Sequence, residues 1–224
     1  MHIIVQQPRR NWTSPTLCLL VVISLVSVAA FASSALFYTL AFRGSDWYTR
    51  PWSLLTTGFV HGNLLHLLVN GVVLYFLGTA LERMIGTPKL LILFLGGVIA
   101  GALPYAVIGS PVPLVGASAG VAAIFALFAL LQPNARLLLF FVLPIRCRTL
   151  LIGFIVISAL GGAAAILSAS PAGGGIAHLA HLGGLIFGVL VHRRFGTPRA
   201  SGLRPTARES TWSGQESGRF QMMR

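Results

Sequence analysis

Acidic residues are scarce in this chain: only 4 of its 224 residues are Asp or Glu, against 16 Lys and Arg. Charged residues of both signs make up 9% of the sequence, whereas 55% is hydrophobic and the mean hydropathy is +0.83. Such a composition provides too little polar surface to cover a water-soluble domain. The scarcity of charge therefore argues against a soluble enzyme and predicts a protein whose solvent is the lipid bilayer.

Cysteine is scarce as well, with 2 residues in the whole chain. Cys18 lies inside the first apolar run and Cys147 lies between two arginines, so no disulfide framework is predicted. The net charge of +12 would suggest a nucleic-acid partner in a soluble protein. Here the basic residues lie between apolar runs and in the C-terminal segment, where they set membrane topology, and we expect no nucleic-acid binding.

Long apolar runs, by contrast, are abundant. A helix needs roughly 20 apolar residues to cross the hydrocarbon core. Six segments approach this length: about 16–40, 64–81, 89–109, 117–132, 149–168 and 176–192. We therefore predict an all-α polytopic membrane protein, a six-transmembrane-helix bundle over residues 16–192, between an N-terminal segment 1–15 and a disordered basic tail 193–224.

Two segments allow a second interpretation. Arg9 and Arg10, followed by an apolar run and small residues near position 33, resemble a cleavable secretory signal, but the uncharged run 11–42 is long enough to favour a retained first helix. Residues 135–145 are apolar too. Pro144 and the flanking arginines favour an interfacial segment there, with a seventh span as the alternative.

Lys and Arg are concentrated in alternate loops, which predicts the orientation of the bundle. They precede the first span, occupy the second and fourth loops and follow the sixth span, and the third and fifth loops have none. These residues are Arg9, Arg10, Arg83, Lys89, Arg136, Arg146, Arg148, Arg193 and Arg194. Only the first loop, with Arg43 and Arg50 beside Asp46, departs from this pattern. Since cytoplasmic loops hold the excess of positive charge, we expect both termini in the cytoplasm. A bacterial inner membrane is the expected location.

Four polar residues lie inside the predicted spans: His66, Asn70, Ser118 and His181. His66 and Asn70 are four residues apart, on one helix face, and Ser118 and His181 lie near the starts of the fourth and sixth spans. Because spans two, four and six all enter from outside, these groups share one depth. A lone membrane serine usually bonds its own preceding turn. Unpaired His and Asn in hydrocarbon are costly, however, and together the four residues favour a functional site.

Small residues predict that the helices carrying this site pack closely. Gly116 and Gly120 bracket Ser118, and Gly184 and Gly188 follow His181 at helical spacing. If spans four and six touch, His181 is the best-placed base for the Ser118 hydroxyl. No Asp or Glu lies where it could orient the imidazole, which predicts a dyad rather than a triad. The Ser118 N–H, the Asn70 amide and His66 are candidate donors to an oxyanion.

Several motifs resemble those of one family, the rhomboid intramembrane serine proteases. Residues 116–120 (GASAG) resemble its G-x-S-x-G serine motif, and residues 177–184 (AHLAHLGG) are similar to its sixth-span histidine motif, with His181 at the catalytic position. The spacing of His61, His66 and Asn70 resembles the second-span H-x₄-H-x₃-N pattern. The similarity extends over roughly residues 50–192 and includes the pair Glu82-Arg83.

The resemblance implies a six-helix bundle that hydrolyses a peptide bond in or beside the transmembrane helix of a membrane-protein substrate, with no metal or organic cofactor. It also implies that His66 and Asn70 help to bind the oxyanion and that His61 and Gly116 support the site. Where the family has a Trp-Arg pair in its first loop, this chain has Trp52-Ser53, with an arginine two residues before Trp52.

Two further expectations concern substrate access and a second base. We expect the loop 171–175 to cover the site and the fifth span to shift and admit a substrate helix laterally. His178 is a second candidate base, although three residues along a helix turn it about 60° from His181.

Two other functions remain open from the sequence. A metal or haem protein would use His61, His66, His178 and His181 as ligands, although H-E-x-x-H is absent. A non-catalytic membrane-protein binder or transporter would leave Ser118 unreactive. The sequence names neither the substrate nor the oligomeric state.

Overall fold

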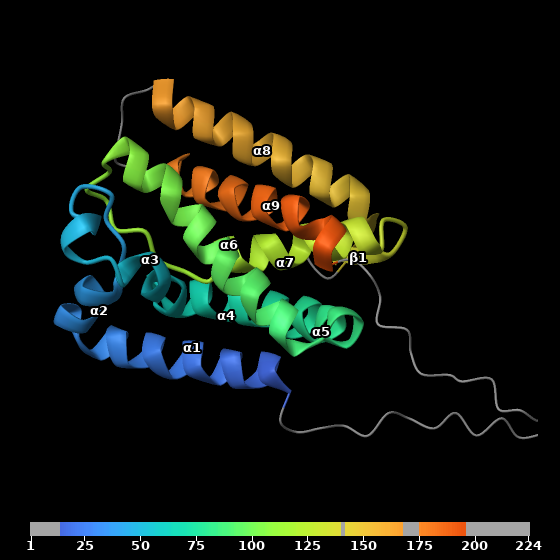
Figure 1. Ribbon diagram of the computed structural model, residues 1–224, viewed down its shortest axis with the longest axis horizontal. Helices are drawn as coiled ribbons and strands as arrows, with labels where there is room; N and C mark the ends of the chain where they lie inside the picture. Colours follow the sequence, from blue (N-terminus) through green and yellow to red (C-terminus); the bar gives the residue numbers. More distant parts are fainter. Residues whose placement is uncertain (1–13, 140–141, 168–174, 196–224) are drawn as a thin grey trace, which may run out of the picture.

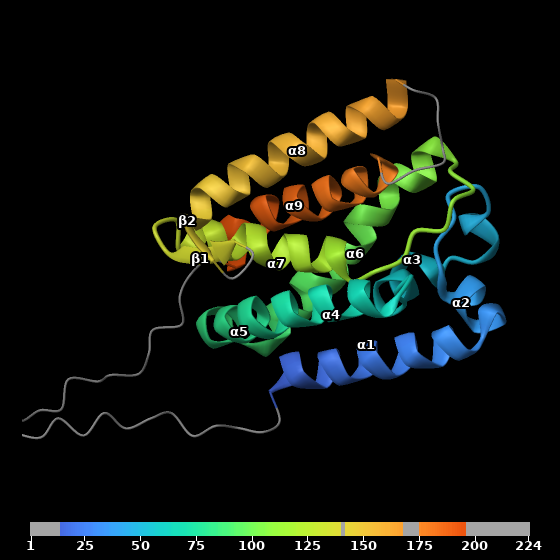
Figure 2. The same cartoon turned by 180° about the vertical axis from the view of Figure 1, so that it is seen from behind.

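A computed structural model describes residues 14–139, 142–167 and 175–195, which form a bundle of long helices lying side by side (Figures 1 and 2). The helices are α1 (Pro15–Ala32), α2 (Ser34–Leu40), α3 (Ser53–Thr56), α4 (Leu64–Val73), α5 (Thr79–Ile85), α6 (Thr87–Ile108), α7 (Ser118–Leu131), α8 (Cys147–Leu167) and α9 (Gly175–Phe195). Short 3₁₀ segments, Trp47–Thr49 and Thr57–Phe59, lie in the first loop. The predicted all-α membrane bundle is confirmed.

Four stretches of the described residues are long and apolar enough to cross a membrane by themselves: Pro15–Ala32, Leu64–Ile85, Thr87–Ile108 and Cys147–Leu167. The stretch Leu64–Ile85 joins α4 to α5 through a π-helical segment, Leu74–Gly78. The predicted fourth span is α7, a shorter apolar helix of 14 residues. The predicted sixth span is α9, which carries polar and basic residues along its 21 residues.

The first predicted span, 16–40, is wrong as a single helix because the chain breaks at Ser33. Ser33 has extended backbone angles, and its hydroxyl accepts a hydrogen bond from the N–H of Leu36 (3.2 Å). A serine in this position caps the next helix, so α2 starts in a new direction. The sixth helix runs three residues past the predicted boundary at 192, to Phe195. Of the predicted terminal segments 1–15 and 193–224, residues 1–13 and 196–224 lie outside the described residues.

The apolar segment 135–145 is a β-hairpin. Strands β1 (Arg136–Leu139) and β2 (Leu143–Arg146) pair antiparallel, with Arg136 opposite Arg146. Four residues of strand extend only about 13 Å, too short to cross a bilayer. The alternative of a seventh span is therefore wrong, and the interfacial interpretation of this segment fits the observed hairpin.

Close backbone contacts place α9 against both α6 and α7. A Cβ atom on Gly184 or Gly188 would collide with the carbonyl oxygens of Ala119 and Ala123 on α7, and one on Gly183 would collide with that of Ala100 on α6. In Figure 1, α9 runs between α8 and this pair of helices. The predicted small-residue contact between the fourth and sixth spans is confirmed.

At the far end of the bundle, Glu82 of α5 fixes the start of α1. Its carboxylate accepts hydrogen bonds from the hydroxyls of Ser14 (2.7 Å) and Thr16 (2.5 Å) and from the N–H of Thr16 (3.2 Å). Thr87 of α6 donates to the other oxygen at 3.2 Å. A carboxylate at a helix N-terminus is favoured by the unpaired N–H groups there, so Glu82 ties three helices together.

Candidate active site

Ser118 and His181 form a hydrogen bond between α7 and α9. The Ser118 Oγ lies 2.9 Å from Nε2 of His181, and both side chains are partly buried. Ser118 is the first residue of α7, so its backbone N–H is one of the unpaired donors of a helix N-terminus. The structure thus brings together the serine and histidine that the sequence predicted as a pair.

The turn before Ser118 requires glycine at position 116. Gly116 has φ +119°, a region in which side chains are strained, and a Cβ placed on it would lie 2.6 Å from Cε1 of His66. Its N–H donates to the carbonyl of Thr57 at 3.0 Å. Two residues earlier, Leu114 pairs with Phe42 through two backbone hydrogen bonds of 3.1 and 2.8 Å. The predicted support residues Gly116 and His66 therefore meet directly beside Ser118.

His61 holds the other side of this turn. Its Nε2 accepts a hydrogen bond from the N–H of Ala117 (3.2 Å), the residue before Ser118, and its Nδ1 lies 2.9 Å from the hydroxyl of Ser27 on α1. The His61 side chain is fully buried in the loop that leads into α4. Burial, reinforced by the neighbouring His66, lowers the pKa of His61 to about 4, so the ring is neutral at neutral pH.

Asn70 lies one turn beyond His66 on the same face of α4, as predicted. It is 7% exposed, and its side-chain amide donates to the carbonyl of His66 at 2.9 Å. This bond uses one of the two amide hydrogens, which leaves the other for a ligand. The rings of His61 and His66 adjoin edge to face, with centroids 4.9 Å apart. All six predicted site residues therefore lie on α4, α7, α9 or the two loops that lead into α4 and α7.

Comparison with known proteins identifies the family of this chain. A family model described as "Rhomboid domain" matches residues 48–196, well over half of the chain. The chain belongs to the rhomboid family. Its match begins after α1 and α2 and includes every predicted site residue.

Curated relatives give rhomboid similarity over the same part of the chain. "Rhomboid protease GluP" of Bacillus subtilis is 32% identical over 150 residues, covering 66% of this chain and 27% of that protein. "Rhomboid protein 1, mitochondrial" of Saccharomyces cerevisiae is 30% identical, covering 65% and 42%. "RHOMBOID-like protein 12, mitochondrial" of Arabidopsis thaliana is 32% identical, covering 60% and 44%. This rhomboid chain spans less than half the length of these relatives.

His178 does not reach the serine of this rhomboid. Its ring meets that of His181 edge to face at 6.3 Å and packs against Gly161 of α8, where any side chain would displace it. Its Nδ1 is buried and has no hydrogen-bond partner among the described residues. The other neighbour of the His181 ring is Phe154 of α8, at 5.5 Å between ring centroids. His181 is therefore the only histidine of α9 recorded in contact with Ser118 within residues 175–195.

The first loop of this rhomboid has its own ion pairs. Arg50 donates to both carboxylate oxygens of Asp46 (2.8 and 3.0 Å) and to the carbonyl of Tyr38 (2.6 Å). Arg43 also contacts Asp46, at 3.1 Å. The departure from the family's Trp-Arg pair thus leaves Arg50 with partners, and the loop is closed on itself beside the Phe42–Leu114 contact.

The histidines within the described residues are not arranged as a ligand set. Within residues 14–139, 142–167 and 175–195, no three His, Cys, Asp or Glu side chains are grouped as metal ligands would be. Both ring nitrogens of His61 already have protein partners, as does Nε2 of His181.

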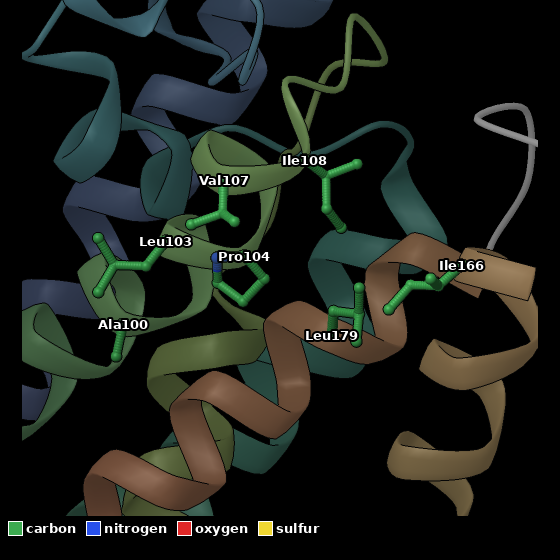
Figure 3. Close-up of a pocket in the computed structure, with 7 residues that line it drawn as sticks. All are labelled: Ala100, Leu103, Pro104, Val107, Ile108, Ile166 and Leu179. Atoms are coloured by element: carbon green, nitrogen blue, oxygen red, sulfur yellow. The ribbon is translucent and has the colours of Figure 1, made fainter. Parts of the chain in front are cut away.

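A groove of about 430 Å³ lies elsewhere, between α6, α8 and α9 (Figure 3). It is lined by Ala100, Leu103, Pro104, Val107, Ile108, Ile166 and Leu179. None of these side chains can donate, accept or transfer a proton, so the groove has no means of catalysing a hydrolysis. The polar chemistry of the bundle is concentrated at Ser118 and His181 instead.

Ser27 is one residue at this site that the sequence did not single out, and Phe154 beside the His181 ring is another. Ser27 is one of several hydroxyl residues in the apolar first span, and nothing in the sequence of α1 shows which side faces the active site. The only feature of Ser27 in the sequence is that it is a small polar residue among apolar ones, and Ser24 has the same feature.

Proposed function

We propose that this chain is an intramembrane serine endopeptidase in which Ser118 is the nucleophile and His181 the general base. The 2.9 Å contact between Oγ and Nε2 is the observation that supports it, because a serine hydroxyl attacks only when a base accepts its proton. His181 takes that proton as Ser118 adds to the substrate carbonyl, and returns it to the departing amine. Water then attacks the acyl-enzyme, with His181 again acting as base.

The negative charge on the tetrahedral intermediate needs donors already in place. The Ser118 N–H at the start of α7, the remaining Asn70 amide hydrogen and the ring of His66 surround the serine turn and are proposed to supply them. No carboxylate is recorded beside His181 among the described residues, so this imidazole is oriented by its hydrogen bond with Ser118 and by the rings of Phe154 and His178. No metal or organic cofactor takes part in the proposed reaction.

Ser118→Ala and His181→Ala test the assignment in purified protein reconstituted into liposomes. Each variant should lose cleavage of a transmembrane substrate by at least about a thousandfold, and wild-type Ser118 should react with a fluorophosphonate probe only when His181 is present. His178→Ala is the matched control and should retain probe labelling. Full cleavage by Ser118→Ala would overturn the assignment. A folded wild-type protein that neither cleaves nor labels would instead favour the non-catalytic binder.

The proposed substrate is a membrane protein whose transmembrane helix enters sideways as α8 moves. Only 17% of the residues in the apolar stretch of α8 are buried, compared with 39% in α6, which supports α8 as the helix that moves. The loop 171–175, expected to cover the site, lies outside the described residues. Lateral entry is the reason that a substrate helix can reach Ser118 through the bilayer.

Linking α8 to α4 tests lateral entry. Cys18 and Cys147 are replaced by alanine, and one cysteine on the outer half of each helix is joined by a bifunctional maleimide. Linked protein should lose cleavage of a transmembrane substrate while Ser118 still reacts with a small fluorophosphonate. The same double-cysteine protein without the linker is the control. Undiminished cleavage after linking would contradict lateral entry.

We also propose that both termini face the cytoplasm of a bacterial inner membrane. The basic residues of the α5–α6 turn, the hairpin and the end of α9 lie at one end of the bundle, opposite the ends of α6 and α8 (Figure 1). An impermeant maleimide should label a cysteine at Gly109 in intact cells and one at Lys89 only after lysis. The reverse pattern would overturn this orientation.

A further inference from the structure

We propose that Ser27, on the first transmembrane helix, is a positioning residue of the active site: its hydroxyl determines which nitrogen of His61 carries the proton. Through that ring it holds the turn at Ala117 and Ser118. Ser27 lies outside residues 48–196, which match the family model. The catalytic consequence of this inference rests on the proposed protease function. The predicted tautomer of His61 does not depend on that function.

The proton positions follow from the partners of the Ser27 hydroxyl. Its oxygen lies 3.0 Å from the carbonyl of Phe59, to which it donates, and 2.9 Å from Nδ1 of His61. A hydroxyl has a single hydrogen, and a carbonyl can only accept, so that hydrogen is on the Phe59 side. The contact with His61 must therefore have the hydrogen on Nδ1.

The opposite side of the ring requires the same tautomer. The Ala117 backbone N–H points at Nε2 of His61 from 3.2 Å, and a backbone N–H can only donate. Nε2 must therefore be the unprotonated nitrogen. Two independent contacts, one from α1 and one from the serine turn, therefore specify the same neutral form of His61.

Burial makes this arrangement sensitive to loss of the hydroxyl. Ser27 and His61 are both fully buried, so water has no access to replace a missing partner. Without the Ser27 oxygen, the Nδ1 hydrogen would be left unpaired, and the ring would gain by moving its proton to Nε2 or by turning. Either change places a donor or a carbon atom against the Ala117 N–H and releases the turn.

Release of this turn would displace Ser118 from both its base and its oxyanion donors. Ala117 is the last residue before α7, so its position sets where the Ser118 N–H and Oγ begin. Small displacements of reacting groups lower turnover strongly. A purely structural Ser27, serving only to join α1 to the loop at Phe59, would lower thermal stability without altering turnover of the folded protein.

Kinetics on the full chain in liposomes separate these two roles. Ser27→Ala should lower kcat by about ten- to hundredfold with KM changed less than about threefold, because substrate binding does not involve the turn's geometry. Ser27→Thr retains a hydroxyl and should recover most of kcat. Ser24→Ala is the matched control: Ser24 is on the same helix, its hydroxyl has no recorded partner within the described residues, and the variant should behave as wild type. An unchanged kcat in folded Ser27→Ala would overturn the inference.

The tautomer itself is measured by nitrogen-15 NMR of histidine-labelled protein, with the His61 signals assigned by their absence in His61→Asn. Wild type should show a protonated Nδ1 and an unprotonated Nε2, and Ser27→Ala should shift or broaden both. A proton on Nε2 in wild type would overturn the inference, even if Ser27→Ala fails to fold. If wild type lacks protease activity but has the predicted tautomer, the proposed function fails while the hold of Ser27 on His61 stands.

Discussion

Ser118 and His181 come from two halves of the bundle that are held together in different ways. On the side of α1 and α4, hydrogen bonds join Ser27 to His61 and His61 to Ala117 around the serine turn, and at the far end of the bundle they join Glu82 to the start of α1. On the side of α8 and α9, two buried polar atoms, the Ser158 hydroxyl and Nδ1 of His178, lack partners within the described residues, and glycine contacts and aromatic rings provide the packing. A third such atom, Nε of Arg43, lies in the first loop.

The difference suggests a division of labour in the proposed reaction. Electrostatic stabilisation of an oxyanion needs donors that are fixed before the substrate arrives, which hydrogen bonds in a low-dielectric interior achieve. Admission of a substrate helix needs a helix that separates at low cost, and contacts without hydrogen bonds leave no donor unpaired when they part. The hydrogen-bonded half would thus hold the nucleophile, and the half that includes α8 would open.

Gly116→Ala should have the largest effect on activity, because Gly116 is the residue of the hydrogen-bonded half that both requires a positive φ and lies against His66. The substitution forces a side chain at φ +119°, at a cost of about 1–3 kcal/mol, and pushes His66 away from the turn. Cleavage and fluorophosphonate labelling should each fall by about a hundredfold or more.

Gly109→Ala is the control for backbone strain alone. Gly109 also has a positive φ, +67°, but no atom lies within 4 Å of a Cβ placed there. It should lose some thermal stability and keep its labelling rate. Equal loss of labelling in both variants would show that strain, rather than displacement of His66, explains the effect.

Glu82→Gln should weaken the hydrogen-bonded half at its other end. The carboxylate accepts four hydrogen bonds from Ser14, Thr16 and Thr87, and bonds to a charged acceptor contribute about 1.5–3 kcal/mol. Thermal unfolding in detergent should shift downward accordingly, with kcat of the folded protein little changed. Arg83→Gln, at the exposed neighbour, should leave the transition where it is. An unchanged unfolding temperature in Glu82→Gln would show that the hydrogen bonds of Glu82 do not stabilise this half of the bundle.

Much of the half formed by α8 and α9, here called the looser half, could be predicted from the sequence, as could both members of the dyad. His181 and Ser118 stand out because ionisable and polar groups are expensive in hydrocarbon, and Gly184 and Gly188 predict the close approach of their helices. The orientation inferred from Lys and Arg placed them at one depth. Each of these arguments needs only the residue type and its position along a span.

The hydrogen-bonded half was less predictable because its contacts depend on the rotation of α1 and on loop geometry. Ser27 and Ser24 are equivalent in the sequence, and only the packing of α1 against the Phe59–His61 loop distinguishes them. The break at Ser33 also escaped prediction, since a serine inside an apolar run is compatible with a continuous helix. The sequence of the hairpin at Arg136–Arg146 indicates only an apolar interfacial segment, and the pairing of its two strands is seen only in the structure.

Phe154→Ala tests whether ring packing is what orients the base in the looser half. The Phe154 ring lies 5.5 Å from that of His181, and aromatic pairs of this kind contribute about 0.5–1.5 kcal/mol. We expect kcat to fall by about two- to tenfold, and Phe154→Tyr to retain more of it. Ile157→Ala, on the exposed side of α8, is the control. An unchanged kcat in Phe154→Ala would show that His181 keeps its orientation without this contact.

Ser158→Ala should have the smallest effect, and its sign is the sharpest test of the comparison. The Ser158 hydroxyl is fully buried on α8 and has no hydrogen-bond partner among the described residues. An unpaired hydroxyl is costly to bury, so its removal should leave thermal stability unchanged or raise it by up to about 1 kcal/mol. Ser27→Ala, the same substitution in the hydrogen-bonded half, should lower stability by about 1–3 kcal/mol. If Ser158→Ala is as destabilising as Ser27→Ala, the α8–α9 side contains a hydrogen-bond partner for Ser158, such as a bound water, and the two halves are built alike.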